Sequence, residues 1–294
     1  MTEFIQAIVN GIASGSVYAV LALSIALIFK TMGAVNFAAG SMGAVSAFLF
    51  YLFATKLGLG WILGVLLALA GAALLGALVE RGIVRPIGGG GESVLFRLVL
   101  ATMGLDILLN SATQQVFGAD SRSLGLPLPD GSIALGDVSV DAGRLVIVLI
   151  AVLGATGLAL ILRNTNLGVG LRAYAQDPLA AVLMGIPART VSRWTWIMAS
   201  ILGGVAAILV ASITVLSVGY LQPSFLQAIT AAVLGGLASL PGAVAGGFVL
   251  GIAEALSDTY APTGVTTVLP LAVVIVVLMI RPSGLFGRAV AQRA

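Results

Sequence analysis

The residue types in this chain restrict its chemistry before any fold is considered. It contains no Cys and no His, so it cannot supply a Cys/His zinc site or a Ser-His-Asp group. A phosphate-binding Walker A loop needs Gly-Lys followed by Ser or Thr, whereas Lys30 follows Phe29 and Lys56 follows Thr55. An intramembrane enzyme would need a Ser/Lys or paired-Asp site, and Asp106 is the only Asp inside a clear apolar span. The sequence therefore predicts a non-enzyme whose use of ATP depends on a partner.

The composition indicates the solvent in which the chain folds. Of 294 residues, 60% are hydrophobic and 9% are charged, and the mean hydropathy is +1.15. A soluble domain carries about 25% charged residues. The net charge of +3 does not indicate nucleic-acid binding, because the basic residues are scattered singly between long apolar runs. We therefore predict an integral membrane protein, surrounded by lipid, with a single transmembrane domain over residues 1–294.

Apolar runs long enough to cross a bilayer occur along the whole chain. A crossing helix needs about 20 mostly apolar residues. The clear runs are Phe4–Phe29, Val35–Phe53, Trp61–Val79, Leu95–Phe117, Leu145–Leu162, Trp194–Leu216 and Val265–Ile280. A further run over residues 225–256 is too long for one crossing. Gly235–Gly236 and Pro241–Gly242 interrupt it, so we predict two shorter helices there, broken or re-entrant. The predicted fold is all-α, a polytopic bundle of about eight spans.

Small residues recur at four-residue spacing on several of these runs. Two such stripes are Gly64-Ala68-Ala72-Gly76 and Ala243-Gly247-Gly251-Ala255. Helices in lipid associate where small residues let their backbones approach closely, so the stripes predict tight contacts within a compact bundle.

Basic residues at the span ends predict the orientation. If the spans alternate, eleven Lys and Arg residues fall on one side and three on the other. The eleven are Lys30, Arg81, Arg85, Arg97, Arg163, Arg172, Arg189, Arg193, Arg281, Arg288 and Arg293; the three are Lys56, Arg122 and Arg144. Because cytoplasmic loops are rich in Lys and Arg, we expect a cytoplasmic loop at 164–192 and an extracytoplasmic loop at 118–142. Weak alternation over Ser132–Val140 predicts a short hairpin in the outer loop.

Polar residues at the start of the second span form a patch, Asn36-Phe37-Ala38-Ala39-Gly40-Ser41. Two interpretations are open. The patch is either a helix break whose residues line a path through the bundle, or an ordinary Asn cap at a helix start.

The fourth span carries Asp106, Asn110 and Gln114 on one helical face. An acidic group at membrane depth is costly and faces a cavity or a partner. Asp106 therefore either lines the route or pairs with a base on a neighbouring helix. Glu80 lies beside Arg81 at the end of the third span, where we expect a residue of the membrane interface.

The 164–192 loop is long for a connection in a compact bundle. Asp177-Pro178 predicts a helix start, with Asp as the cap and Pro in the first turn. A short helix over Leu179–Met184 would follow, ended by Gly185 and blocked by Pro187. Held between two spans flanked by Arg, such a helix could transmit force to both. An ordinary surface loop is the alternative.

The ordered set of short motifs resembles the permease subunits of ATP-binding-cassette importers for branched-chain amino acids. The matching pieces are Asn10-Gly11, Gly15–Ala19, Val35–Ala38, Arg85-Pro86, Thr102–Leu105, Leu167-Gly168, Arg172-Ala173, Gln176–Pro178, Ala181, Gly185-Ile186, Ala231–Gly236, Pro241–Ala243, Gly246-Gly247, Gly251, Glu254 and Arg281–Gly287. Single pieces are weak, but their order over nearly the full length is specific.

The resemblance implies a role for the loop and a set of partners. The coupling segment that contacts an ATPase would comprise Arg172, Ala173, Asp177, Pro178, Ala181, Gly185 and Ile186. Candidates for the translocation pathway are Asn36, Phe37, Asp106, Asn110, Gly235 and Gly236. The implied partners are a second, homologous permease, two cytoplasmic ATP-binding subunits and an extracytoplasmic substrate-binding protein. This chain would hold no cofactor or metal, since ATP and Mg would bind to the ATPase subunits, and it would lie in the bacterial inner membrane.

Two departures from the family pattern leave the substrate open. The family commonly has His-Gly-Glu where this chain has Ala39-Gly40-Ser41, and a glycine is missing after Pro223. The same architecture could therefore move an amide, urea, or an aromatic or other organic acid. A stand-alone secondary transporter is a further alternative, which the lack of a charged relay disfavours.

Overall fold

A computed structural model describes residues 2–87, 92–129, 131–135, 138–260, 265–281 and 283–287. Arg288 and Arg293, which contribute to the expected orientation, lie outside these residues. The helices are α1 (Thr2–Met32), α2 (Ala39–Phe50), α3 (Trp61–Val79), α4 (Arg85–Ile87), α5 (Glu92–Phe117), α6 (Ala142–Asn164), α7 (Asn166–Gln176), α8 (Pro178–Leu183), α9 (Ala188–Ile213), α10 (Gln222–Gly235), α11 (Leu240–Tyr260) and α12 (Val265–Ile280). Two π-helical turns, η1 (Tyr51–Lys56) and η2 (Glu80–Val84), extend α2 and α3.

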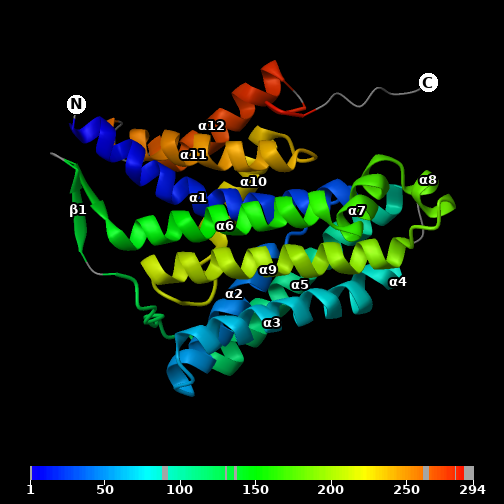
Figure 1. The fold of residues 1–294 in the computed structure, drawn as a ribbon, viewed down its shortest axis with the longest axis horizontal. Coiled ribbons are helices and arrows are strands. Elements are labelled where there is room, and N and C mark those ends of the chain that lie inside the picture. The colour runs from blue at the N-terminus through cyan, green and yellow to red at the C-terminus, as the bar shows by residue number, and fades with distance from the viewer. Residues whose placement is uncertain are drawn as a thin grey trace.

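The long helices run roughly along the longest axis of the molecule (Figure 1). Among the described residues, six helical stretches are long and apolar enough to cross a membrane: Thr2–Met32, Trp61–Ile87, Val94–Phe117, Ala142–Asn164, Ala188–Ile213 and Leu240–Tyr260. α2, α10 and α12 are shorter, with 12, 14 and 16 residues. The prediction of an all-α polytopic bundle is confirmed.

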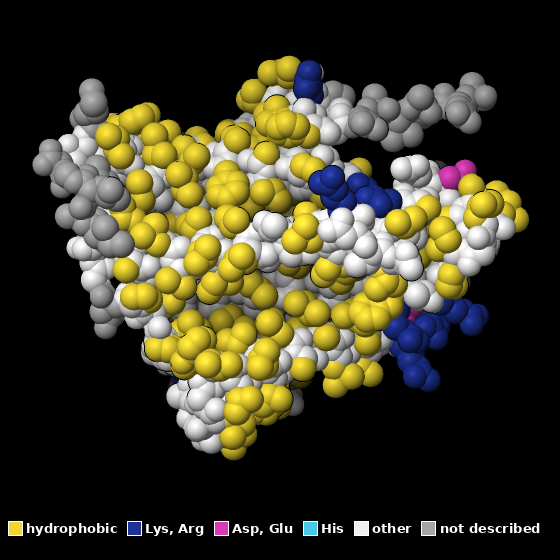
Figure 2. Space-filling model, viewed as in Figure 1, with side chains coloured by type: hydrophobic (Ala, Val, Ile, Leu, Met, Phe, Trp, Pro, Cys, Tyr) yellow, Lys and Arg dark blue, Asp and Glu magenta, His cyan; other side chains and the backbone are white. Residues whose placement is uncertain are grey.

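The core lies around α1 and α9, which are the most deeply buried of the six stretches. α1 packs against α6, α9, α10 and α11, while α9 also packs against α2 and α3. By contrast, α3, α5 and α6 leave broad apolar faces exposed. The visible surface is accordingly covered with hydrophobic side chains (Figure 2), as expected of a protein whose solvent is lipid.

The predicted small-residue stripes form helix contacts. Gly64, Ala68, Ala72 and Gly76 are buried on α3. On α11, Gly247 and Gly251 lie against the backbone of α1, opposite Ala19 and Gly15. A Cβ added at Gly247 would lie 2.5 Å from the Ala19 Cα, so the two helices can approach this closely only because the side chain is absent.

The predicted break in the 225–256 run is confirmed, between α10 and α11. α10 ends at Gly235, and Gly236 has φ +99°, a left-handed conformation that favours glycine. The chain after α12 returns to this turn, where the Leu285 and Phe286 amides donate to the Leu234 and Gly235 carbonyls. The two helices extend beyond the predicted range, because α10 starts at Gln222 and α11 ends at Tyr260.

One end of the bundle carries the predicted hairpin. Strands β1 (Ser132–Leu135) and β2 (Val138–Asp141) pair antiparallel, with Ser132 opposite Asp141. In Figure 1 this hairpin and the N-terminus lie at the end opposite α7 and α8. The visible Lys and Arg side chains gather mainly at the α7 and α8 end, with others near the end of α12 (Figure 2). This distribution agrees in direction with the expected orientation.

Glu80 directly follows α3, and its position at the membrane interface stays a prediction. The side chain is buried, with 1% of its surface exposed, and its Oε2 lies 3.2 Å from Arg85 Nη2. Residues five apart meet because η2 is π-helical, whereas an α-helix would bring together residues three or four apart.

We expect Gly247→Ala to destabilise the protein, because the new methyl group would contact the α1 backbone, which cannot move away as a flexible side chain can. Overpacking of this kind costs about 1–3 kcal/mol. Gly157→Ala on α6 is the matched control, since a Cβ there has nothing within 4 Å. The measurement is the thermal midpoint of each detergent-solubilised variant. Equal midpoints would contradict the close α1–α11 contact.

Candidate functional site

The α7–α8 segment is attached firmly to the bundle. Thr165 caps α7, and its Oγ1 accepts from the Gly168 amide at 3.1 Å. Gly168 packs directly against the backbone of Leu162, the last buried residue of α6. α7 also contacts α1 and α9, and Leu171 is buried among them. α7 is therefore packed against α6, α1 and α9 together.

The local geometry predicted for the short helix is confirmed. Asp177 caps α8, and its Oδ1 accepts from the Ala180 amide at 2.9 Å, while Pro178 occupies the first turn. α8 ends at Leu183, and Gly185 follows in a left-handed conformation with φ +85°. The Ile186 amide donates to the Ala181 carbonyl at 3.0 Å, which closes the helix end.

The predicted coupling residues differ in their exposure. Arg172, Asp177, Pro178 and Gly185 are exposed, Ala173 and Ile186 are half-buried, and Ala181 is buried. Ala181 therefore lies on the inward face of α8, away from solvent. α8 and the residue after it present apolar side chains outward: Leu179, Leu183 and Met184 are 72%, 78% and 83% exposed.

The Asn36 patch lies where a non-helical segment, residues 33–38, meets the start of α2, and its last three residues begin that helix. Asn36 is buried, its Oδ1 accepts from the Ala38 amide at 3.0 Å, and the Phe37 amide donates to Thr102 Oγ1 at 3.3 Å. Of the two interpretations, the helix break is present. Asn36 does not cap α2, because the capping position is Ala38 and carries no side-chain cap. The two cavities that Asn36 lines are about 10 Å³ each, room for a water but not for a solute.

The other pathway candidates lie on α5 and at the α10–α11 turn, apart from Phe37, which follows Asn36. Asp106 and Asn110 are half-buried on α5, and Asp106 Oδ1 has no hydrogen-bond partner. Gly235 and Gly236 lie at the α10–α11 turn, packed against Gly242 and the segment 283–287. The left-handed conformation of Gly236 and the close contacts of both glycines allow that turn, and their place on a pathway stays a prediction.

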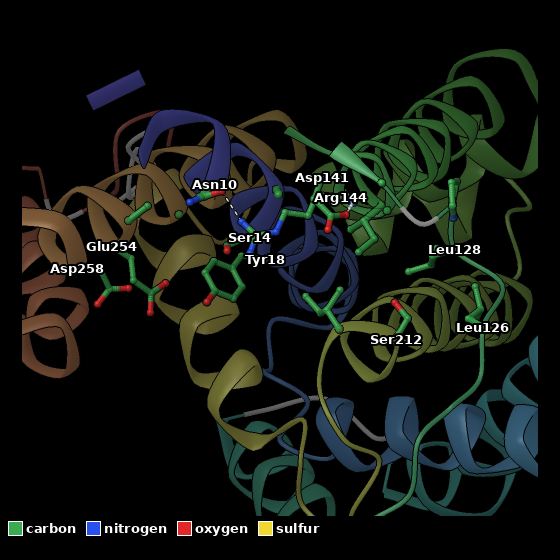
Figure 3. A pocket seen from close by; sticks show the side chains of 18 of the residues that line it. Asn10, Ser14, Tyr18, Leu126, Leu128, Asp141, Arg144, Ser212, Glu254 and Asp258 are labelled. Carbon is green, nitrogen blue, oxygen red and sulfur yellow. Dashed lines mark hydrogen bonds between the residues drawn. The ribbon is translucent and has the colours of Figure 1, made fainter. Parts of the chain in front are cut away.

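The large cavity lies at the hairpin end and has a volume of about 780 Å³. Its lining comes from α1, α6, α9, α11 and the segment before the hairpin. Figure 3 shows Glu254, Asp258 and Tyr18 on one side of this cavity and Arg144 with Asp141 on another. Glu254 Oε1 accepts from Gln227 Nε2 at 3.1 Å, whereas its buried Oε2 has no hydrogen-bond partner. The Arg144 guanidinium donates to Asn10 Oδ1, which links α6 to α1.

The lining residues carry a spacing signal that the sequence reasoning did not use. Asn10, Ser14 and Tyr18 occupy one face of α1, and Glu254 and Asp258 are one turn apart on α11. Among the described residues, no group of three acidic side chains is arranged to hold a metal ion.

The bundle and its apolar surface define a multi-pass membrane protein, and comparisons with known proteins identify its family. The family described as "Branched-chain amino acid transport system / permease component" matches residues 7–278. The chain is 30% identical to the high-affinity branched-chain amino acid transport system permease protein LivH of Escherichia coli (strain K12), over 97% of this chain and 96% of that protein. It is 29% identical to the permease protein BraD of Pseudomonas aeruginosa, with the same coverage. A probable LivH permease of Methanocaldococcus jannaschii is 26% identical over 91% of this chain and 87% of that protein.

This chain therefore belongs to the branched-chain amino acid transport system permease family. It is a transport permease, and the expected family is confirmed.

The cavity predicts a clear difference in thiol reactivity, because the chain has no Cys of its own. We expect Ser14→Cys and Ser212→Cys, both in the cavity lining, to react with a water-soluble maleimide. Ser16→Cys is the control, since Ser16 is fully buried two residues along α1. Labelling is measured by the mass shift of the detergent-solubilised protein. The same rate at all three positions would contradict the cavity.

Proposed function

We propose that this chain is the membrane-spanning subunit of an ATP-binding-cassette importer that moves branched-chain or related hydrophobic amino acids across the bacterial inner membrane. The observation that carries the proposal is its relationship, over residues 7–278, to permeases named for branched-chain amino acid transport. ATP is hydrolysed by two separate cytoplasmic subunits that bind ATP and Mg. An extracytoplasmic binding protein delivers the substrate.

α8 is the proposed docking element for an ATPase subunit. This six-residue helix lies outside the apolar spans, so the exposed side chains of Leu179, Leu183 and Met184 form an apolar patch. Such a patch is typical of a surface that a partner protein covers. Asp177, Pro178, Ala181 and Gly185 fix the shape of α8, while Arg172, Ala173 and Ile186 belong to its base on α7 and before α9. Such a contact would pass force through α7 to α6 and α9.

A second, homologous permease is the proposed neighbour of α5. Only 17% of the apolar stretch of α5 is buried, yet this helix carries Asp106, Asn110 and the exposed Gln114. Polar side chains at membrane depth are costly in lipid and face a partner or a water-filled path. A permease–permease contact there would cover the exposed face of α5 and would place Asp106 and Asn110 near the translocation route.

The sidedness follows from charge. The α7–α8 end gathers Lys and Arg and is the proposed cytoplasmic end, which makes the 118–142 segment and the large cavity extracytoplasmic. The cavity would then be the first part of the path that a released substrate enters.

The coupling role predicts that Asp177→Arg and Gly185→Trp uncouple uptake from ATP hydrolysis. The first replaces an exposed acidic cap with a long cation, and the second adds a large side chain at a residue with φ +85°. A clash of more than about 1.4 kcal/mol weakens docking tenfold. ATP-dependent leucine uptake and ATPase activity are measured in proteoliposomes that contain the assembled importer and its binding protein.

Two controls accompany these variants. Asp177→Asn preserves the helix cap, because Asn caps as well as Asp, and Asp120→Arg adds the same cation at the opposite end. Both should transport normally. Normal uptake by Asp177→Arg and Gly185→Trp would refute the coupling role of α8.

A further inference from the structure

The large cavity is lined by the carboxylate of Glu254, whose two oxygens are not both hydrogen-bonded within the protein. Glu254 Oε1 accepts from Gln227, and the Tyr18 side chain lies close to the same carboxylate, but Oε2 forms no hydrogen bond of good geometry. An enclosed carboxylate oxygen without a donor is costly, because it has lost water and gained nothing in exchange. Because Glu254 lines the cavity, a bound solute can offer its carboxylate a further donor.

The position of Glu254 is fixed from two sides. Gly251 precedes Glu254 by three residues on α11. It lies against the α1 backbone at Gly11 and Gly15, so α11 cannot shift relative to α1 there. Gln227 holds the carboxylate from α10. The Tyr18 ring faces the same carboxylate from α1 (Figure 3). A carboxylate held in this way is preorganised to accept a hydrogen bond.

The charges around the cavity select the sign of its ligand. Its described lining includes three carboxylates, Glu254, Asp258 and Asp141, and one cation, Arg144. The guanidinium of Arg144 donates to Asn10 Oδ1 and lies on a different side of the cavity from Glu254 (Figure 3). The excess of negative charge attracts a cationic group and repels an organic anion. No group of three acidic side chains among the described residues is suited to a metal ion, which favours an organic cation.

The remaining lining suits the rest of an amino acid. Ile147, Ile213, Leu126 and Leu128 supply apolar surface in the same cavity, and a volume of about 780 Å³ exceeds that of a single aliphatic amino acid. One ligand can therefore place a charged amine at the acidic wall and an aliphatic side chain on the apolar wall.

We propose that this cavity is a solute-binding site in which the Glu254 carboxylate accepts a hydrogen bond from the ammonium group of an aliphatic amino acid. The inference rests on the proposed import function, which it deepens by naming the recognised group. It favours amino acids over the organic-acid alternatives, because an acid without an ammonium group has nothing to offer Glu254.

The test measures binding directly, in the assembled importer in detergent and without its binding protein. Ser14→Cys places the single thiol of this chain in the cavity, and its maleimide labelling rate is followed on this chain by mass. The probes are L-leucine and 4-methylpentanoate, which has the same aliphatic chain without the ammonium group. Leucine should slow labelling, and 4-methylpentanoate at the same concentration should not.

The decisive variant is Glu254→Gln, which keeps the oxygen that Gln227 needs and removes the charge. Loss of one charge-assisted hydrogen bond should raise the leucine concentration for half-protection roughly tenfold. Glu254→Asp should retain part of the protection. Glu3→Gln, an exposed Glu at the start of α1 outside the cavity lining, is the matched control and should behave as the parent.

Three results would overturn the inference: equal protection by 4-methylpentanoate, unchanged half-protection in Glu254→Gln, or equal protection by sodium chloride. Failure of the proposed function is recognised separately. If the parent importer with its binding protein shows no ATP-dependent leucine uptake in proteoliposomes, the import function fails, whatever the labelling shows. Normal uptake together with unchanged protection in Glu254→Gln rejects only the ammonium site.

Discussion

The close contact between α1 and α11 is the constraint on which the rest of the structure depends. In lipid the hydrophobic effect does not hold helices together, so association relies on close packing and on polar contacts. Gly11 and Gly15 on α1 meet Gly247 and Gly251 on α11 with backbone against backbone. Because α1 also packs against α6, α9 and α10, this contact sets the position of the central helix for its other neighbours. It also places Tyr18 beside Glu254.

Interrupted helices are tolerated in this bundle because protein surrounds them. Free backbone groups cannot face lipid, so breaks at membrane depth must be buried or must line a cavity. The non-helical segment before α2 is satisfied by the Asn36 and Thr102 side chains. The segment before α10 is held by Tyr220, whose hydroxyl donates to the Ala207 carbonyl in the middle of α9. The starts of α2 and α10 then meet, since Gly40 lies against Gln222 and Phe225.

The sequence was sufficient for features that depend on local spacing. The stripe from Gly64 to Gly76, the Asp177 cap and the break at Gly236 each follow from residues close together in the chain, and the structure has all three. The ion pair between Glu80 and Arg85 was not predicted, because the two residues meet only through a π-helical turn and neither residue signals that turn.

The cavity could not be predicted from any single span. It forms where α1, α6, α9 and α11 converge, so its lining depends on which helices become neighbours. The polar residues that stood out in the sequence, such as Asn36, lie instead where the fold needs a buried hydrogen bond. The Asn10-Ser14-Tyr18 face of α1 was visible as a pattern. That this face lines a cavity becomes apparent only because Glu254, far away in the sequence, lines the same cavity.

The two functional regions share the same supports, which gives the proposed coupling a physical route. α6 begins at the cavity, where Arg144 and Ile147 line it, and ends at α7. α9 begins beside α7 and α8 and ends at the cavity with Ser212 and Ile213. Each helix is about 35–40 Å long at a rise of 1.5 Å per residue. Because α7 is held to both, a partner that moves α8 displaces helices whose far ends form the cavity wall. By thermodynamic reciprocity, a solute that favours one arrangement of that wall must also favour one position of α8.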